Sequence, residues 1–84
     1  MLKMYSIYDA MVEAFVNPMF FRTDREAQRS FLDEANREDS NIHLHRDHYS
    51  LYCVGVFDDD TGLVTGNNEP VLIVRADLHE GKDV

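Results

Sequence analysis

Hydrophobic and polar positions alternate along the first residues of the chain, which predicts a β-strand over residues 3–9. The tyrosine and isoleucine side chains of this segment favour the pleated conformation. Ala14–Val16 predicts a second short strand, which Asn17-Pro18 ends because proline restricts the residue before it and has no N–H to donate. Met19–Arg22 then continues as an extended run after this kink.

The strongest local signal is the run Thr23-Asp24-Arg25-Glu26, which predicts the start of a helix. Thr23 can accept a hydrogen bond from the Glu26 N–H while the Glu26 carboxylate reaches back to Thr23. The helix should run from Asp24 to about Arg37, with apolar residues on one face at Ala27, Phe31, Leu32 and Ala35. This spacing predicts that Phe31 anchors the helix in the core. Asn36–Asp47 is polar without an apolar period, so we expect a loop there.

A strand, a tight acidic turn and a return strand follow, over Tyr49–Asp58, Asp59–Gly62 and Leu63–Thr65. The glycine that ends the turn suits a backbone position with positive φ. Gly66–Pro70 breaks the strand pattern. Val71–Leu78 is open between two structures, because its first four residues favour a strand and its last four accept a helix.

These elements predict an α+β fold with a small, mainly antiparallel sheet in the order β-β-α-β-β, followed by a C-terminal strand or short helix. Short links suit hairpins, whereas parallel pairing needs long crossovers. The helix is expected to pack on one face of the sheet. A ferredoxin-like order is the neighbouring alternative if Val71–Val74 joins the sheet. We expect residues 1–84 to form a single domain whose last residues, 79–84, fray.

The strand over Tyr49–Asp58 is apolar or aromatic on both of its faces. Strict alternation places Tyr49, Leu51, Cys53 and Phe57 on one side and Tyr52, Val54 and Val56 on the other. The helix can cover only one side, and leaving the other in water forgoes roughly 1.5–3 kcal/mol for each large side chain. Either the C-terminal segment covers that side or, as we favour, a second copy does. The expected interface of such a homodimer consists of Tyr52, Val54 and Val56.

Composition limits the classes of function. The chain has 84 residues, 44% of them hydrophobic, which is typical of one small globular domain with a thin core. Its 16 acidic and 8 basic residues give a formal net charge of -8, which repels nucleic acid at long range. The single cysteine suggests a reducing compartment. The sequence shows neither a signal-peptide pattern nor an apolar run of about 18 residues, so we expect a cytoplasmic protein that does not span a membrane.

Three groups of residues invite a chemical role. The first is a cluster with metal-ligand chemistry, His43, His45 and His48. Its spacing matches no known metal motif, so a solvated loop is the better interpretation. The run Asp58-Asp59-Asp60 lacks the alternating ligands and the terminal glutamate of an EF-hand and predicts a turn. Cys53 has no base beside it in the sequence and predicts a small core residue. We therefore expect neither enzymatic activity nor a cofactor.

Four arginines are expected opposite Phe31 on the helix and its flanks: Arg22, Arg25, Arg29 and Arg37. Acidic residues share this surface, so one interpretation is a solvated face that neutralises itself. The other is a stripe that contacts the phosphates of single-stranded DNA, with exposed aromatic rings stacking on the bases. The candidate rings are Phe20, Phe21, Tyr5 and Tyr8. Such binding would be sensitive to salt and would oppose the net charge.

Three segments in combination resemble a known family: Met4–Asp9, Phe21–Ala27, and Leu51–Asp58 together with Thr61-Gly62. They are similar to the small non-structural protein of gokushovirus-type microviruses, which are tailless phages with circular single-stranded DNA. The similarity covers about residues 3 to 65 of this chain.

The resemblance implies a DNA-binding or replication-associated protein with no established catalytic residues. It implies a role in the switch from duplex replication to single-strand synthesis, in the cytoplasm of the host bacterium. The acidity of this chain favours a regulator that contacts a phage or host replication protein and touches single-stranded DNA only through a local basic patch. The alternative is an acidic, homo-oligomeric interaction module with no direct DNA binding.

Overall fold

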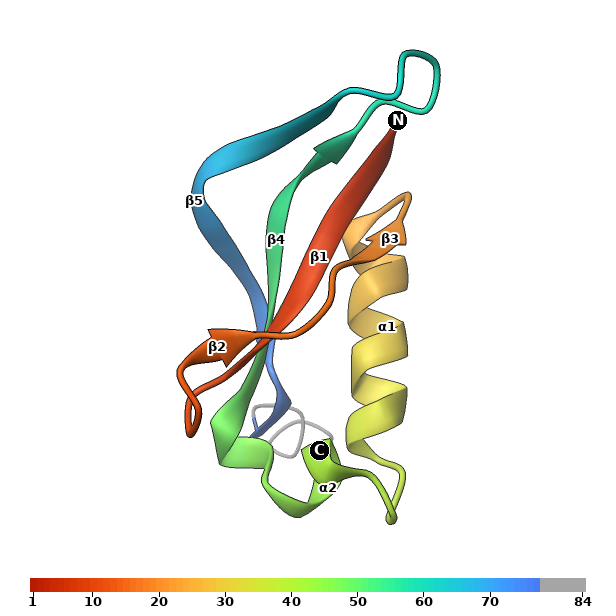
Figure 1. Cartoon of the computed structure of the whole chain (residues 1–84). Helices are drawn as coiled ribbons and strands as arrows, with labels where there is room; N and C mark the ends of the chain where they lie inside the picture. Colours follow the sequence, from red (N-terminus) through yellow and green to blue (C-terminus); the bar gives the residue numbers. More distant parts are fainter. Residues whose placement is uncertain (78–84) are drawn as a thin grey trace.

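The computed structural model describes residues 1–77 and confirms the predicted α+β fold. Five strands form one sheet, and one long helix packs against it (Figure 1). The elements in chain order are β1 (Leu2–Asp9), β2 (Ala14–Phe15), β3 (Met19–Phe21), α1 (Asp24–Ala35), α2 (Asn41–Leu44), η1 (Arg46–His48), β4 (Tyr49–Phe57) and β5 (Val64–Arg75).

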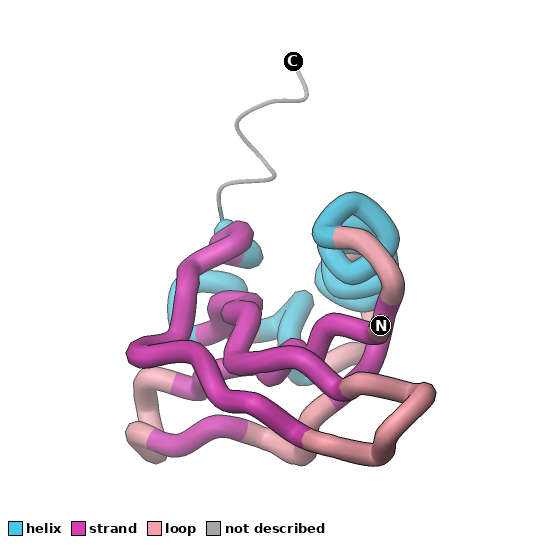
Figure 2. Tube along the Cα trace, turned by 90° about the horizontal axis from the view of Figure 1, so that it is seen from above, coloured by secondary structure: helices cyan, strands magenta, loops and turns pink. Residues whose placement is uncertain are grey.

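The strands pair in the order β2-β1-β4-β5, and β3 also pairs with β1. Every described pair is antiparallel, as predicted. A hairpin joins β4 directly to β5, so the ferredoxin-like order, which needs a second helix before its last strand, is wrong. Figure 2 shows α1 on one side of the sheet; within residues 1–77, no helix lies over the opposite face.

β2 and β3 pair with successive parts of β1 and are interrupted at residues 16–18, in agreement with the predicted kink at Asn17-Pro18. At the bend, the Val16 N–H donates to the Ile7 carbonyl at 2.9 Å, and the Ser6 hydroxyl donates to the Val16 carbonyl at 2.6 Å. Ser6 is buried, so this bond satisfies a hydroxyl that water does not reach. The kinked segment therefore stays hydrogen-bonded to β1.

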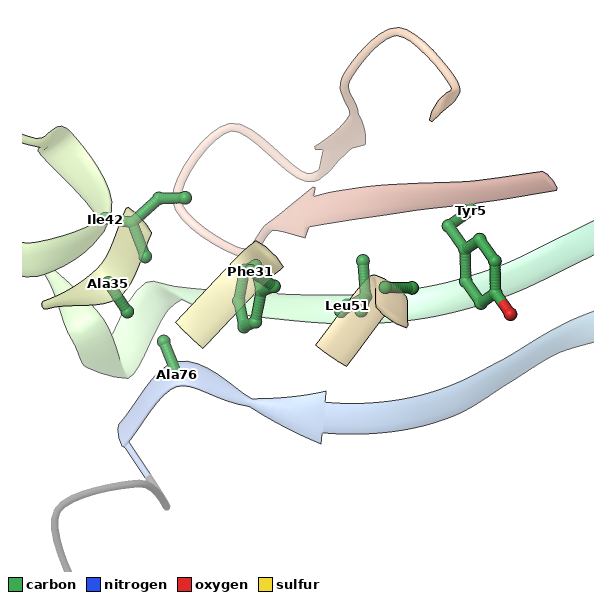
Figure 3. Packing of buried hydrophobic residues seen from close by; sticks show 7 residues of the cluster. Tyr5, Phe31, Ala35, Ile42, Leu51 and Ala76 are labelled. Atoms are coloured by element: carbon green, nitrogen blue, oxygen red, sulfur yellow. The ribbon is translucent and has the colours of Figure 1, made fainter. Parts of the chain in front are cut away.

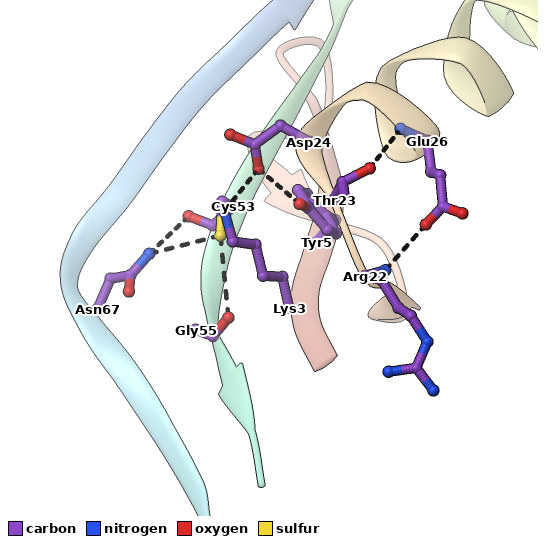
Figure 4. A network of polar contacts seen from close by, with 9 residues as sticks. All are labelled: Lys3, Tyr5, Arg22, Thr23, Asp24, Glu26, Cys53, Gly55 and Asn67. Carbon is purple, nitrogen blue, oxygen red and sulfur yellow. Dashed lines mark hydrogen bonds and ion pairs between the residues drawn. The ribbon is translucent and has the colours of Figure 1, made fainter. Parts of the chain in front are cut away.

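The start of α1 follows the predicted capping pattern, with one difference. The Thr23 hydroxyl accepts from the Glu26 N–H at 3.1 Å, as expected. The Glu26 carboxylate, however, accepts from the Arg22 N–H at 3.1 Å rather than from Thr23 (Figure 4). The helix ends at Ala35 instead of continuing to about Arg37.

The segment predicted as a loop, Asn36–Asp47, contains α2 and the start of η1. Ser40 begins α2, because its hydroxyl accepts from the Ile42 N–H at 3.0 Å and from the His43 N–H at 3.5 Å. Ile42 is buried in the core. A single turn with two apolar residues, of which only Ile42 is buried, has no periodicity to detect, which is why the loop prediction was wrong.

The acidic turn before β5 forms as predicted, with Gly62 at φ +80° and its N–H donating to the Asp58 carbonyl at 2.7 Å. The expected break at Gly66–Pro70 is instead an irregularity within one continuous strand, which bows away from β4 (Figure 1). Val71–Val74 is therefore strand, not helix. The predicted fraying of residues 79–84 lies outside the described residues.

The core lies between α1 and the sheet (Figure 3). Its buried members are Tyr5, Ala27, Phe31, Ala35, Ile42, Leu51 and Ala76. The prediction that Phe31 anchors the helix is confirmed, since only 3% of its surface is exposed. Cys53 packs at the edge of this core, as predicted.

Candidate nucleic-acid interface and the open sheet face

A buried tyrosine fixes the N-terminal turn of α1 against β1. The Tyr5 ring is fully buried, and its hydroxyl donates to the Asp24 carboxylate at 2.6 Å (Figure 4). Lys3 contacts the same carboxylate oxygen at 3.2 Å. Burial, together with the bond to Asp24, raises the pKa of Tyr5, and the bond from Tyr5 lowers the pKa of Asp24. These contacts hold the start of the arginine-bearing helix in place.

The four predicted arginines have different surroundings. Arg25 and Arg29 are exposed, lie one helical turn apart on α1, and make no ion pair with another described side chain. Arg22 is exposed just before the helix and contributes weakly to lowering the pKa of Asp59.

Arg37 is held by acids instead. Its guanidinium contacts Glu34 at 2.7 Å and Asp39 at 3.0 Å, and these contacts raise its pKa. Its charge is therefore already matched by carboxylates of the same chain. The structure thus brings Arg25 and Arg29 together on α1 and places Arg22 just before the helix. Arg37 is paired with carboxylates instead.

The Arg25–Arg29 pair borders a depression on the outer surface of α1, together with Gln28, Leu32 and Asn36. Two carboxylates, Glu26 and Asp33, line the same depression. Locally, therefore, two positive charges face two negative ones. This surface is close to neutral, in contrast to the chain as a whole.

The three histidines do not converge. The His43 Nδ1 lies 2.9 Å from the Ala35 carbonyl, which also accepts from Arg46 at 3.4 Å. His45 and His48 stack on each other instead, with ring centroids 5.5 Å apart. In the part of the chain that the structure describes, no three histidine, cysteine or acidic side chains are arranged to hold a metal ion. His43 and Arg46 thus meet at the carbonyl of Ala35, the last residue of α1, and the Arg46 guanidinium also lies 3.0 Å from the His43 Nδ1.

The side chains of β4 do not alternate strictly, because β4 carries a bulge at Val54. Tyr5 pairs with Cys53, but the preceding residue of β1, Met4, pairs with Gly55. The extra residue reverses the alternation beyond it. The assignment of Val56 and Phe57 from the sequence is therefore wrong.

The pairing partners show the reversal directly. Val56 pairs with Lys3, whose amine contacts α1, so Val56 faces the helix side. Phe57 contacts Phe20 on the opposite side, at 5.8 Å between ring centroids. The three residues of the predicted dimer interface therefore do not share one face. Tyr52 lies on the side away from α1, Val56 lies on the helix side, and Val54 is the bulged residue between them.

The face away from α1 is here called the open sheet face. It consists of the even-numbered residues of β1 and of the residues in β2, β3 and β4 that pair with them. It also includes the β5 residues that pair with these particular β4 residues. Its centre is an aromatic cluster in which Tyr8 lies 4.9 Å from Phe15 and 6.3 Å from Tyr52, and Phe15 lies 5.6 Å from Tyr52. The alternation of β1 could have revealed Tyr8; nothing local in the sequence placed Phe15 on it.

These features define a small α+β protein with a near-neutral arginine surface on its helix and an aromatic surface on its sheet. The chain belongs to the phage ORF5 protein family, whose sequence model, described as Phage ORF5 protein, matches residues 2–78. The phage origin implied by the sequence resemblance is thereby confirmed. Searches of curated proteins and of solved structures return no match. None of the described helices is long and apolar enough to cross a membrane.

Proposed function

We propose that this chain is the small non-structural protein of a gokushovirus-type microvirus, and that it regulates viral DNA replication or the switch to single-stranded genome synthesis. It acts by binding rather than by catalysis, in the cytoplasm of the host bacterium. Membership of a phage protein family supports the viral part of this proposal. The observation that carries the DNA contact is the exposed Arg25–Arg29 pair on α1.

The geometry of α1 suits contact with a phosphate backbone. The pair presents two guanidinium groups at i, i+4 spacing, and these groups are donors that match phosphate oxygens. Arg22 extends the same surface toward the start of the helix. Arg37 is left out of the site, because Glu34 and Asp39 already occupy its donors.

The net charge of -8 opposes binding but does not forbid it. Charges separated by more than about 8 Å in water are largely screened at physiological salt, so the local surface decides close contact. With two or three phosphate contacts, the logarithm of affinity should fall with the logarithm of salt concentration with a slope of about -1.4 to -2. The expected binding is therefore weak and only moderately salt-dependent.

Fluorescence anisotropy with labelled single-stranded DNA tests this proposal. The double variant Arg25→Ala/Arg29→Ala should lose most of the binding at low salt and flatten the salt slope. Arg37→Ala is the matched control, because it removes an arginine of the same segment that is held by acids, and it should bind as the wild type does. If the wild type shows no salt-dependent binding at low salt, the proposed DNA contact is wrong.

A second candidate is an acidic interaction module that binds a phage or host replication protein and no DNA. The net charge of -8 favours it, because this charge repels nucleic acid at long range. The same anisotropy series separates the two candidates. The interaction module is favoured if the wild type does not bind single-stranded DNA but co-purifies with a replication protein of the infected cell.

A further inference from the structure

The open sheet face is almost free of charge in a chain of which 29% of residues are charged. Among the described residues that pair in register, Arg75 is the one charged residue on this face. The Arg75 guanidinium is held by Asp77, at 3.3 and 3.4 Å to the two carboxylate oxygens. Depletion of charge is the compositional mark of an interface centre.

Large apolar side chains remain exposed on this face. Phe15 is 43% exposed, Phe20 46%, Leu72 49% and Val64 61%. Phe15 belongs to the aromatic cluster, and Leu72 pairs with Tyr52 of that cluster. Val64 pairs with Phe57, whose ring contacts Phe20. Burying such a contiguous patch is favourable because apolar surface is removed from water.

We propose that the open sheet face is the interface of a homodimer, in which the faces of two copies pack against each other around a twofold axis. Two chains of charge -8 repel each other, and this uncharged face is a surface on which they can meet without placing carboxylates together. A twofold axis brings like surface against like, so an apolar face meets an equally apolar face.

The size of the molecule allows such an interface. The two larger extents are 40 and 26 Å, which leaves room for the roughly 800 Å² per partner that a stable interface buries. Sheets pack face to face at about 10 Å, with aromatic and aliphatic side chains interdigitating. The cluster around Tyr8 and Tyr52 supplies such side chains.

Two other occupants fit less well. Single-stranded DNA could stack bases on the aromatic rings, but its phosphates would find no unpaired cation on this face. Pairing along the outer edge of β5 is hindered by the irregularity at residues 67–70, which contains Glu69 and Pro70. Bulges, charges and proline are the features that keep an edge strand from pairing.

The dimer has a consequence for the proposed DNA contact, and this part rests on that proposal. α1 lies on the side of the sheet opposite the proposed interface (Figure 2). In the dimer, the two copies of the Arg25–Arg29 pair would therefore lie on opposite outer sides. They cannot merge into one basic groove. The dimer would instead hold two DNA segments, one on each outer side.

Sedimentation equilibrium of the full chain over micromolar concentrations tests the interface. The wild type should be a dimer, and Leu72→Lys should weaken the dimer more than about tenfold, since a twofold axis brings two buried ammonium groups into the interface. Val71→Lys is the matched control. Val71 is the next residue on β5 and is 52% exposed, but it pairs with Cys53 and so faces the helix side. It adds the same charge and should leave the dimer intact.

A second neighbouring pair guards against a folding defect. Val64→Lys lies on the open sheet face and should weaken the dimer, whereas Leu63→Lys, in the turn and 66% exposed, should not. Circular dichroism reports whether each variant is folded. A monomeric wild type overturns the inference, as does equal weakening by Val71→Lys and Leu72→Lys, or a dimer that survives both open-face variants.

Whether one dimer bridges two DNA segments is measured separately, by energy transfer between two differently labelled single-stranded oligonucleotides. Wild type should bring them together, and Leu72→Lys should bind DNA without bridging it. A dimer that binds no DNA removes the proposed function and leaves the interface standing. Bridging by a chain that sedimentation shows to be monomeric overturns the interface.

Discussion

At the scale of single residues, Tyr5 has two tasks that the sequence does not separate. Its ring fills the centre of the core, and its hydroxyl leaves the core to meet Asp24 at the first turn of α1. The carboxylate also contacts Lys3 and lies where the helix dipole favours negative charge. One side chain thus joins β1 to the helix through both packing and a charge-assisted hydrogen bond.

The ionisation of Tyr5 predicts a loss of stability in alkaline solution. Its folded-state pKa is raised above the ordinary value near 10, mainly by burial. A raised pKa means that the folded state holds the proton more tightly than the unfolded state. The stabilisation is therefore complete below pH ~10 and is lost as the pH rises through and beyond that value. Urea unfolding monitored across this range should show the free energy of unfolding falling.

Tyr5→Phe provides the control for the alkaline measurement. At neutral pH it should cost about 1 kcal/mol, because it removes the hydrogen bond to Asp24 and keeps the ring. Above pH ~10 its stability should fall less steeply than that of the wild type. Tyr52→Phe, which removes a hydroxyl with no described hydrogen-bond partner, should keep the wild-type slope. Parallel slopes for wild type and Tyr5→Phe would contradict the assignment.

At the scale of elements, β4 and β5 approach each other closely where two glycines pair. A Cβ atom on Gly55 would lie 2.5 Å from the Thr65 carbonyl oxygen and 3.1 Å from the Gly66 Cα. Both neighbours are backbone and cannot rotate away. This close approach follows directly after the bulge at Val54, so the bulge and the tight pairing form one feature of the sheet.

The paired glycines should therefore respond differently to alanine. Gly55→Ala should lower the free energy of unfolding by about 1–3 kcal/mol, as overpacking does. Gly66→Ala should change it little, because the nearest atom to its added Cβ would be 3.9 Å away and alanine restricts the unfolded chain. Chemical denaturation of the two variants checks this difference. Equal effects would mean that the strands separate freely at this position.

At the scale of the whole molecule, the two sides of the sheet differ in how they are covered. The side toward α1 holds the core, whereas the open sheet face carries aromatic rings and little charge. A small domain buries a modest fraction of its surface and gains much from a partner. In the proposed dimer, the second copy would cover the open sheet face as α1 covers the other side of the sheet.

Dimerisation through that face predicts that thermal stability depends on protein concentration. Binding that occurs only between folded chains raises the melting temperature as the concentration rises. Circular dichroism melts across a wide concentration range should show this increase for the wild type and for Val71→Lys. Leu72→Lys should show a smaller increase over the same range, because its dimer is weaker. An increase of the same size in Leu72→Lys would count against the open sheet face.

The sequence by itself determined the features that depend on neighbouring residues. The Thr23 cap, the Phe31 anchor, the bend at Asn17-Pro18 and the positive φ of Gly62 all follow from local hydrogen bonding, periodicity or steric limits. The Arg25–Arg29 pair could also be predicted from the sequence, because helix periodicity places these two residues on the same face. These predictions required no knowledge of what lies across the sheet.

Only the tertiary structure decided which side chains share a face of β4. The bulge at Val54 arises where β1, β4 and β5 are matched in register, so it depends on residues far apart in the chain. One extra residue moved Val56 to the helix side and Phe57 to the open face. Likewise, Glu34 and Asp39 are evident in the sequence, but their ion pairs with Arg37 are evident only in the tertiary structure. A period of two residues carries no record of a bulge, because the bulge is set by pairing partners rather than by the strand itself.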